Sequence, residues 1–282
     1  MIELGNYNKL RIVRDTSVGL FLESDTGAEI LLPNKYVPKT FEIGESLTVF
    51  CYLDHDERPV ATSLEPFMKR NEFGFLKVVE VNQIGAFLDW GLEKHLFVPF
   101  REQRDKMKEG QWYVVFCYMD DISFRLVASN KIDKFMNNES LTVQEEDQVR
   151  LLVTRLTDLG WEVIINNLHK GLVFSSDIFK HMAVGQQMDG FIKKIRTDNK
   201  IDVTLQPQGE KVLEPTAQRI FQLLESQGGF LALNDKSDPK EITRVLQMSK
   251  KTFKKGIGTL YKARQIEIKQ DGIYLVKKNN ND

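Results

Sequence analysis

Short runs of Val, Ile, Leu, Phe and Tyr recur along the first two thirds of the chain, and polar turn residues separate them. Where one face of a strand is buried, apolar and polar positions alternate with a period of two. Five strands within about 60 residues are typical of an OB-type barrel, because closure removes the sheet edges that invite aggregation. In the middle of the chain, such strands are predicted near 75–81, 86–90, 95–99, 112–119 and 124–128.

The same pattern occurs more than once. The segment VFCYLD at 49–54 returns as VFCYMD at 115–120, an offset of 115 − 49 = 66 residues. In a weaker third copy, the 25-residue spacing between Gly19 and Gly44 recurs from Gly160. A repeat of this kind indicates one structural unit used three times.

After Pro215 the apolar period becomes helical. The segment TAQRIFQLLESQGG predicts a helix that ends at a glycine pair, FLALN a short strand, and Asp238-Pro239 the start of a second helix. A third helix is predicted from Ser249, and IEIKQDGIYLV predicts a hairpin about an Asp-Gly turn. The core face of the third helix is predicted to contain Phe253, Ile257, Leu260 and Tyr261. This order of elements is typical of a winged-helix domain.

The predicted fold class is therefore mainly β with a C-terminal α+β domain: three tandem OB-fold barrels followed by a winged helix. Two polar segments that lack strand periodicity, 64–72 and 130–148, contain the predicted boundaries between barrels. The predicted domains are 1–64, 70–130, 146–207 and 213–282.

Charge is balanced over the whole chain but not along it. Residues 211–282 contain 14 basic and 8 acidic residues, a net of +6, which leaves 39 − 14 = 25 basic and 40 − 8 = 32 acidic residues elsewhere. Any contact with nucleic acid is therefore expected from local basic surfaces. The segment 249–264 has no Asp or Glu and contains the basic residues Lys250, Lys251, Lys254, Lys255, Lys262 and Arg264. We interpret this segment as a helix whose lysines face nucleic acid; the alternatives are a solvated helix face and a docking surface for an acidic protein.

Several functional classes have no support in the sequence. The four histidines have no paired ligand spacing, and there is no phosphate-binding loop, nucleophile elbow or acidic cluster. We therefore expect no metal, no cofactor and no enzymatic activity; the enzyme alternative is a nuclease whose dispersed carboxylates assemble only in the fold. Cys51 and Cys117 are expected in barrel cores of a protein from a reducing compartment. We expect a cytoplasmic protein with no membrane partner, because no apolar stretch approaches the length of a membrane span. The sequence does not determine the oligomeric state, and a monomer is favoured.

The middle unit resembles the S1 RNA-binding domain through GAFLDWG, LFVPFREQ, MKEGQWYVVFCYMDD and FRLVAS. The first unit matches through GLFL, LLP and RPVATS, and the third through GWEVII, GLVFSSD and VGQQMDG. With KIRTDNKIDVTLQP, DKSDPKEI and MSKKTFKKGIGTLYKARQIEI, the whole chain resembles the conserved virulence factor B family of bacterial S1-like RNA-binding proteins. This resemblance implies three S1 barrels, a winged helix, RNA binding and post-transcriptional regulation.

The S1 resemblance also implies where RNA binds. The Phe of the Gly-x-Phe turn corresponds to Phe21 and Phe87, and the Asp and Arg of the last hairpin correspond to Asp54 with Arg58 and to Asp120 with Arg125. Strand alternation adds Phe50, Tyr52, Phe116 and Tyr118 on the side of those aspartates. Each ring has the alternative interpretation of a packing residue at the barrel end. A histidine common on the third strand of S1 domains is replaced by Pro33, Pro99 and Phe174.

The third unit departs further from the pattern. Trp161 and Glu162 take the places of Ala86 and Phe87, so its contribution is expected from Phe174 and the run Lys193, Lys194 and Arg196. That run is equally interpreted as a charged strand edge that prevents pairing. The predicted partner is single-stranded RNA, with DNA as a second candidate ligand of the winged helix. The alternative function is a module that docks on a ribosome or a polymerase.

Overall fold

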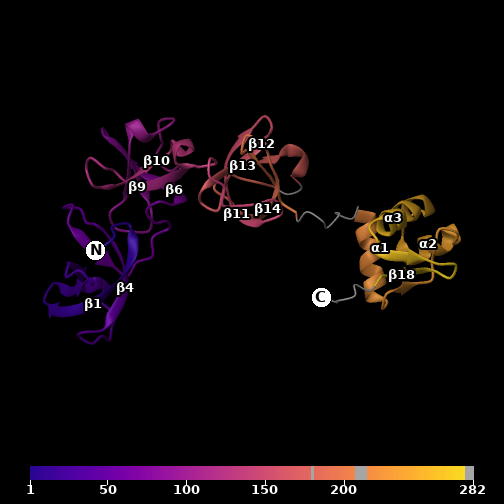
Figure 1. Cartoon of the computed structure of the whole chain (residues 1–282), viewed down its shortest axis with the longest axis horizontal. Coiled ribbons are helices and arrows are strands. Elements are labelled where there is room, and N and C mark those ends of the chain that lie inside the picture. Colours follow the sequence, from indigo (N-terminus) through magenta and orange to yellow (C-terminus); the bar gives the residue numbers. More distant parts are fainter. Residues whose placement is uncertain (179–180, 207–214, 277–282) are drawn as a thin grey trace. The chain divides into compact units, whose positions relative to one another are not determined.

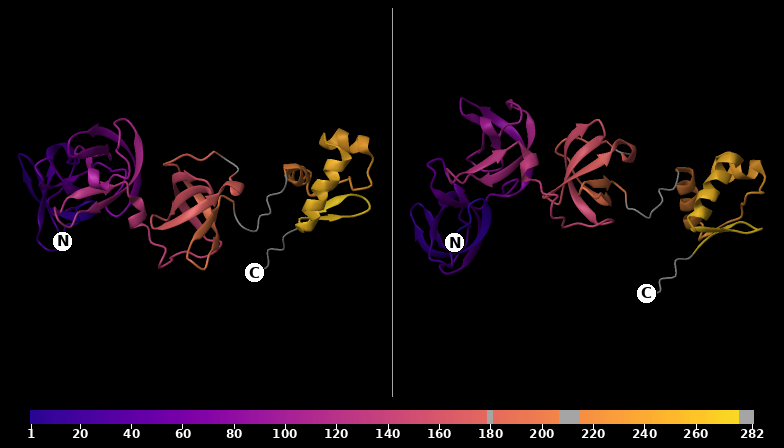
Figure 2. Two further views of the ribbon diagram at one scale, coloured as in Figure 1. Left: turned by 90° about the horizontal axis from the view of Figure 1, so that it is seen from above. Right: turned by 45° about the horizontal axis from the view of Figure 1, so that its top comes forward.

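The computed structural model describes residues 1–178, 181–206 and 215–276. It divides into two compact units, Met1–Leu205 and Gln206–Asp282. The first unit contains three closed β barrels, and the second contains three helices with a small sheet (Figures 1 and 2). The predicted fold class of three OB-like barrels followed by a winged helix is confirmed.

The three barrels share one strand order. In each, the third strand pairs in parallel with the fifth and the other neighbours are antiparallel. Barrel 1 consists of β1 (Asn6–Thr16), β2 (Gly19–Glu23), β3 (Glu29–Pro33), β4 (Ser46–Leu53) and β5 (Pro59–Thr62). Barrel 2 consists of β6 (Phe73–Val81), β7 (Gly85–Asp89), β8 (Leu96–Pro99), β9 (Trp112–Met119) and β10 (Leu126–Ser129). Barrel 3 consists of β11 (Gln148–Thr157), β12 (Gly160–Ile165), β13 (His169–Phe174), β14 (Gln187–Ile195) and β15 (Ile201–Thr204).

The repeat extends to single residues at the second strand of each barrel. A Cβ added to its first residue would lie only 2.1 to 2.3 Å from a backbone carbonyl oxygen of the third strand. No side chain can be accommodated at that distance, so glycine is required where the two strands come together. The three residues are Gly19, Gly85 and Gly160.

Barrel 1 packs against barrel 2 through side chains that point out of the barrel. Cys51 belongs to the core of barrel 1, whereas Phe50 and Tyr52 on either side of it belong to the apolar cluster of barrel 2. Both rings meet Trp90 edge-on, with centroid distances of 5.9 and 6.5 Å. The aromatic side chains of the VFCY repeat therefore fill the junction between barrels.

The equivalent strand of barrel 2 forms the junction with barrel 3. Phe116 of β9 is only 9% exposed and stacks on Phe135, with centroids 4.2 Å apart and planes at 21°. Phe135 belongs to a 3-10 turn, Ile132–Phe135, within the segment predicted to be a linker. The apolar cluster continues into barrel 3 through Leu152 and Ile164. The polar segment between the barrels thus contributes buried residues to the junction. The sequence does not indicate this, because the segment lacks strand periodicity.

A side-chain amide also joins barrels 2 and 3. The Oδ1 of Asn167 accepts a hydrogen bond from the backbone N–H of Phe73 at 2.7 Å, and its Nδ2 donates to the carbonyl oxygen of Asn71 at 3.0 Å. One side chain of barrel 3 therefore satisfies two backbone groups next to barrel 2, so these hydrogen bonds orient the two barrels as well as joining them.

Both cysteines lie in barrel cores, as predicted. Cys51 and Cys117 are fully buried and unpaired, and burial raises the pKa of each thiol to about 12. Each thiol is therefore protonated at neutral pH and serves as a small apolar side chain.

The second unit is a winged helix. It consists of α1 (Pro215–Ser226), β16 (Phe230–Leu231), α2 (Pro239–Leu246), α3 (Lys250–Lys262), β17 (Ile266–Ile268) and β18 (Ile273–Leu275). The Asp238 side chain caps α2 by accepting the backbone N–H of Lys240, and the Ser249 hydroxyl caps α3 by accepting that of Thr252. These caps satisfy amide groups that have no partner within the helix, so both predicted helix starts are confirmed.

One prediction about α3 is wrong. Phe253, Ile257 and Leu260 are buried as expected, but Tyr261 is 57% exposed. At 100° per residue, Tyr261 lies about 80° round the helix from Phe253, whereas Leu260 lies only about 20° from it on the other side. Tyr261 is therefore beyond the edge of the buried stripe.

The packing at the first junction leads to a stability prediction. Phe50→Ala removes a fully buried ring between two barrels and is expected to lower the free energy of unfolding by about 3 kcal/mol. The matched control is Phe67→Ala, which removes a ring that is mostly exposed and should change stability by less than about 0.5 kcal/mol. Urea unfolding followed by circular dichroism measures both, and equally small effects would contradict the assignment of Phe50 to the junction.

Candidate nucleic-acid interface

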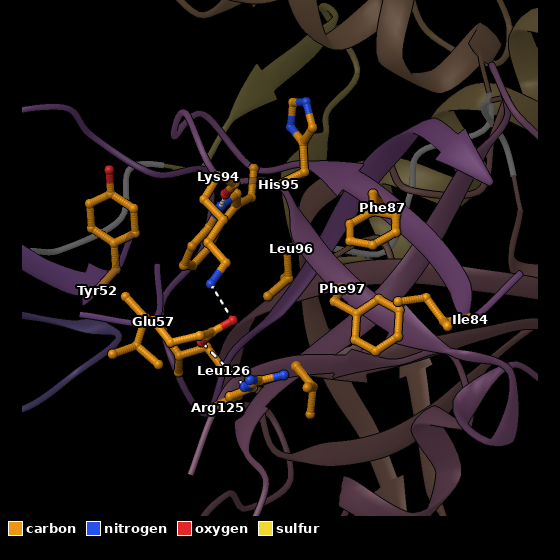
Figure 3. A pocket seen from close by; sticks show the side chains of 13 residues that line it. Tyr52, Glu57, Ile84, Phe87, Lys94, His95, Leu96, Phe97, Arg125 and Leu126 are labelled. Atoms are coloured by element: carbon orange, nitrogen blue, oxygen red, sulfur yellow. Dashed lines mark hydrogen bonds and ion pairs between the residues drawn. The ribbon is translucent and has the colours of Figure 1, made fainter. Parts of the chain in front are cut away.

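The outer surface of barrel 2 carries two aromatic rings side by side. Phe87 of β7 and Phe97 of β8 are directly opposite one another in the ladder, and their ring centroids are 5.1 Å apart. Because strand residues alternate, their neighbours Leu88 and Leu96 point into the core and the two rings point outward. The two rings line a pocket on this surface, and Ile84, which is exposed, lines it with them (Figure 3). We call Ile84, Phe87 and Phe97 the aromatic ledge.

Two cations border the aromatic ledge, and barrel 1 supplies an acid between them. The Nζ of Lys94 lies 2.8 Å from Oε1 of Glu57, and the Nε of Arg125 lies 3.3 Å from Oε2 of the same carboxylate (Figure 3). Lys94 also donates to the backbone carbonyl oxygen of Asp54 at 2.7 Å. The hairpin between β4 and β5 thus places a negative charge beside the positive charges of barrel 2.

Asp54 and Arg58, predicted as a pair, are together in that hairpin. Asp54 accepts hydrogen bonds from Nε and Nη2 of Arg58 at 3.0 and 2.8 Å, and from the backbone N–H groups of Asp56 and Arg58 at 2.9 Å. Burial alone would raise the pKa of Asp54, but these hydrogen bonds outweigh it, so the pKa lies below its ordinary value. The ionised carboxylate organises the turn that presents Glu57.

Asp120 and Arg125, the second predicted pair, have different side-chain partners. Asp120 accepts hydrogen bonds from the backbone N–H and hydroxyl of Ser123 and pairs with Arg101 at 3.0 Å. The Ser123 hydroxyl, above all, lowers the pKa of Asp120. Arg125 pairs with Glu57 of barrel 1 instead. The two residues lie at the base of one hairpin and share only the backbone hydrogen bond from Asp120 N–H to the Arg125 carbonyl.

Phe21 in barrel 1 has surroundings like those of Phe87. Its ring is half-buried, and the guanidinium of Arg14 lies over it at 4.4 Å from the centroid. Arg14 also pairs with Glu29. A ring beside a cation is therefore present on the outer surfaces of both barrels.

Phe116 is not presented to solvent as the sequence suggests, and Tyr118 is presented only in part. Phe116 is covered by Phe135 and by barrel 3, as described above. Tyr118 is half-buried beside the same Phe135 ring, at 5.2 Å between centroids, and burial raises its pKa to about 12. Both rings point out of barrel 2 as alternation requires, but the next part of the chain packs on them.

In barrel 3 the position of the stacking Phe is part of an ion-pair network. Glu162 pairs with Arg155 and, at 3.0 Å, with Lys170. Lys170 and Arg155 also pair with Asp133 of the segment between barrels 2 and 3, at 2.8 and 3.4 Å. This part of barrel 3 therefore holds the preceding segment by charge.

The basic residues predicted to contribute in barrel 3 also have acidic partners. Lys193 pairs with Asp177 at 2.6 Å, and Arg196 pairs with Asp202 at 3.0 Å. Lys194 is exposed on the same strand. Phe174 is half-buried, and the guanidinium of Arg196 lies 5.5 Å from its ring centroid.

Helix α3 presents most of its lysines on one exposed face. Lys251, Lys254, Lys255 and Lys262 are exposed. Lys250 is half-buried and donates to the carbonyl oxygens of Ser237 and Lys236 at 2.7 and 3.3 Å, so it holds the loop before α2. Four of the five predicted lysines are thus placed to meet a ligand.

An exposed apolar residue, which is not among the sequence-based predictions, precedes the repeated glycine in each barrel. Val18, Ile84 and Leu159 are 57%, 61% and 63% exposed. Their recurrence at one position of the repeat could have indicated a functional surface. An apolar residue next to a turn glycine is more often interpreted as a buried packing residue. Phe97 was missed because its strand reads as a continuous apolar run, which does not reveal the outward face.

Metal-binding groups and membrane-spanning helices were both sought among the described residues. In those residues no group of three or more His, Cys, Asp or Glu side chains is arranged to hold a metal ion. Among the described helices, none combines the length and apolar character that crossing a bilayer requires.

Comparisons with known proteins agree with this architecture. Residues 4–64 and 74–131 match the S1 domain family, and residues 218–275 match the CvfB-like winged helix domain. Conserved virulence factor B of Staphylococcus epidermidis is 28% identical over 288 residues, covering 98% of this chain and 95% of that protein. The protein of the same name from Staphylococcus aureus is 26% identical over 245 residues, covering 84% and 81%.

A crystal structure described as a multidomain protein with nucleic acid binding domains, from Streptococcus pneumoniae, is 26% identical and covers 97% of this chain and 98% of that one, with a TM-score of 0.45. The S1 and winged-helix matches fall in the predicted order, and the relatives extend over nearly the whole chain. The chain is therefore similar over nearly its whole length to proteins named conserved virulence factor B, and it contains S1 and winged-helix domains, which are of nucleic-acid-binding classes.

Proposed function

We propose that this protein binds single-stranded RNA without cleaving it and acts in the cytoplasm as a post-transcriptional regulator. The observation that carries the proposal is the aromatic ledge of barrel 2, with Arg125 and Lys94 at its border. Outward rings next to cations suit a strand whose bases are unpaired, because each base stacks on a ring while its phosphate meets a positive charge.

Other surfaces extend this binding mode. Phe21 with Arg14 supplies a second ring and cation in barrel 1, and Lys194 with Phe174 and Arg196 supplies a weaker counterpart in barrel 3. The lysines of α3 supply phosphate contacts, which carry affinity but little sequence information. We leave Phe116 and Tyr118 out of the proposed surface, because the chain itself packs on both rings.

The charges of the interface favour binding over catalysis. The carboxylates near the aromatic ledge form ion pairs with cations of the protein. Asp54 pairs with Arg58, Asp120 with Arg101, and Glu57 with Lys94 and Arg125. Carboxylates engaged in this way stabilise the hairpins and the junction. We assign them no role in activating water.

The aromatic ledge is tested by Phe87→Ala. Stacking of a base on an exposed ring contributes about 1 to 3 kcal/mol, so affinity for an unstructured RNA should fall about 5- to 150-fold. Phe67→Ala removes a ring that is mostly exposed and does not belong to the aromatic ledge, and it should leave binding unchanged. Fluorescence anisotropy gives the affinities, and thermal melting followed by circular dichroism checks the fold. A large loss of stability with normal binding by the folded fraction would show that Phe87 is a packing residue.

The ion pairs at Glu57 generate a second prediction. Glu57→Gln removes the carboxylate that neutralises Lys94 and Arg125, so both cations become available to RNA phosphates. Affinity should rise, and the log-log dependence on salt should steepen by about 0.7 for each new phosphate contact.

The matched control is Asp56→Asn, which removes one negative charge from the same hairpin, where Asp56 pairs only with Arg58 among the described ion pairs. An equal gain in both variants would show that only the overall charge matters. A loss of affinity in Glu57→Gln would show instead that Glu57 orients Arg125 for RNA.

A further inference from the structure

The packing of the winged helix does not explain why residue 258, inside α3, is a glycine. Glycine inside a helix is less stable than alanine by about 1 kcal/mol. At Gly256 the absence of a side chain has a cause, because an added Cβ would lie 2.6 Å from the Cδ1 of Ile220 on α1. At Gly258 an added Cβ would meet no heavy atom within 4 Å other than those of its chain neighbours and of the backbone of its own helix. The protein therefore keeps a destabilising residue at a site that has room for a side chain.

The helix surface around Gly258 is basic and carries one exposed ring. On a helix the nearest surface neighbours of a residue are three and four positions away on either side. For Gly258 these positions are Lys254, Lys255, Tyr261 and Lys262. All four are exposed, so the open space at Gly258 lies among three lysines and a tyrosine on the helix surface, and we call it the depression.

We propose that this depression is a binding site for one backbone phosphate of single-stranded RNA, seated directly over Gly258. The absence of a Cβ lets the phosphate approach the helix closely, so that the ammonium groups of Lys254 and Lys262 reach it from the two adjacent turns. Tyr261 stacks on the neighbouring base, which requires that base to be unpaired. The inference rests on the proposed function and identifies where on the basic face of α3 a phosphate binds. We call this site over Gly258 the phosphate seat.

Two properties of the site set it apart from a solvated row of lysines. A solvated row gains nothing from a central glycine, whereas a phosphate seat loses its ligand when a side chain fills the depression. The exposed ring of Tyr261 likewise has no use to a solvated helix face, but it is what an unstacked base requires. The proposal therefore explains why glycine and an exposed tyrosine lie among the lysines.

The test uses substitutions that leave the charge of α3 unchanged. In the full chain, Gly258→Ala and Gly258→Gln replace glycine with residues of higher helix propensity, so the winged helix should melt about 4 °C higher or more. Binding to an unstructured RNA should nevertheless weaken, by about tenfold for Gln, which is the effect of losing a hydrogen bond to a charged group. Opposite changes in stability and affinity are the expected signature.

Further variants separate this site from general effects on the domain. Tyr261→Ala should weaken binding about tenfold, and Tyr261→Phe should retain most of the affinity because it keeps the ring. Val245→Gln on α2 is the matched control and should leave binding unchanged, because it places the same side chain on another helix.

The outcomes distinguish the inference from the function on which it rests. If wild type binds RNA and Gly258→Gln binds it equally well, the phosphate seat is refuted and the proposed function stands. If the Gly258 variants melt lower than wild type, the depression is not open and the inference is again refuted. A loss of affinity for duplex DNA or for an acidic protein, with RNA binding unchanged, would assign the site to that ligand instead. Absence of RNA binding by the wild type would overturn the function and the inference together.

Discussion

The arrangement of the first unit depends on the outward aromatic side chains of one repeated strand. In VFCY the cysteine packs inside its own barrel, while the flanking Phe and Tyr must point out, because strand residues alternate between two faces. Phe50 and Tyr52 are then buried against Trp90, and Phe116 is buried against Phe135 and barrel 3. Burying rings of this size contributes a large part of the stability of such a contact. The VFCY segment therefore contributes both to the core of its own barrel and to the junction with the next barrel.

This packing determines which surfaces are left for a ligand. Phe116 of β9 is used against barrel 3, whereas the aromatic ledge lies on β7 and β8, which are not adjacent to β9 in the closed sheet. The junction with barrel 1 also brings Glu57 between Lys94 and Arg125, so the charge beside the ledge is set by two barrels together. A single isolated barrel would lack this control of its cations.

Much of the fold could be predicted from the sequence, because strand alternation, the 66-residue repeat and the helix caps are local signals. The buried face of α3 was predicted except at Tyr261, where a periodic rule includes a residue just beyond the stripe that the neighbouring helices cover. The side-chain partners of Asp120 and Arg125 could not be predicted, since each finds a closer opposite charge from a distant part of the chain. Phe116 shows the same limit: alternation gives the direction of a side chain but not what packs on it.

The proposed function depends on the recognition of unpaired nucleotides by outward rings and nearby cations. The most direct measurement is the affinity for one RNA sequence as a single strand and as a duplex, across a range of salt concentrations. We expect tighter binding to the single strand, with a log-log slope of about −0.7 per phosphate contacted. Equal or tighter binding to the duplex, or an affinity that does not change with salt, would contradict it.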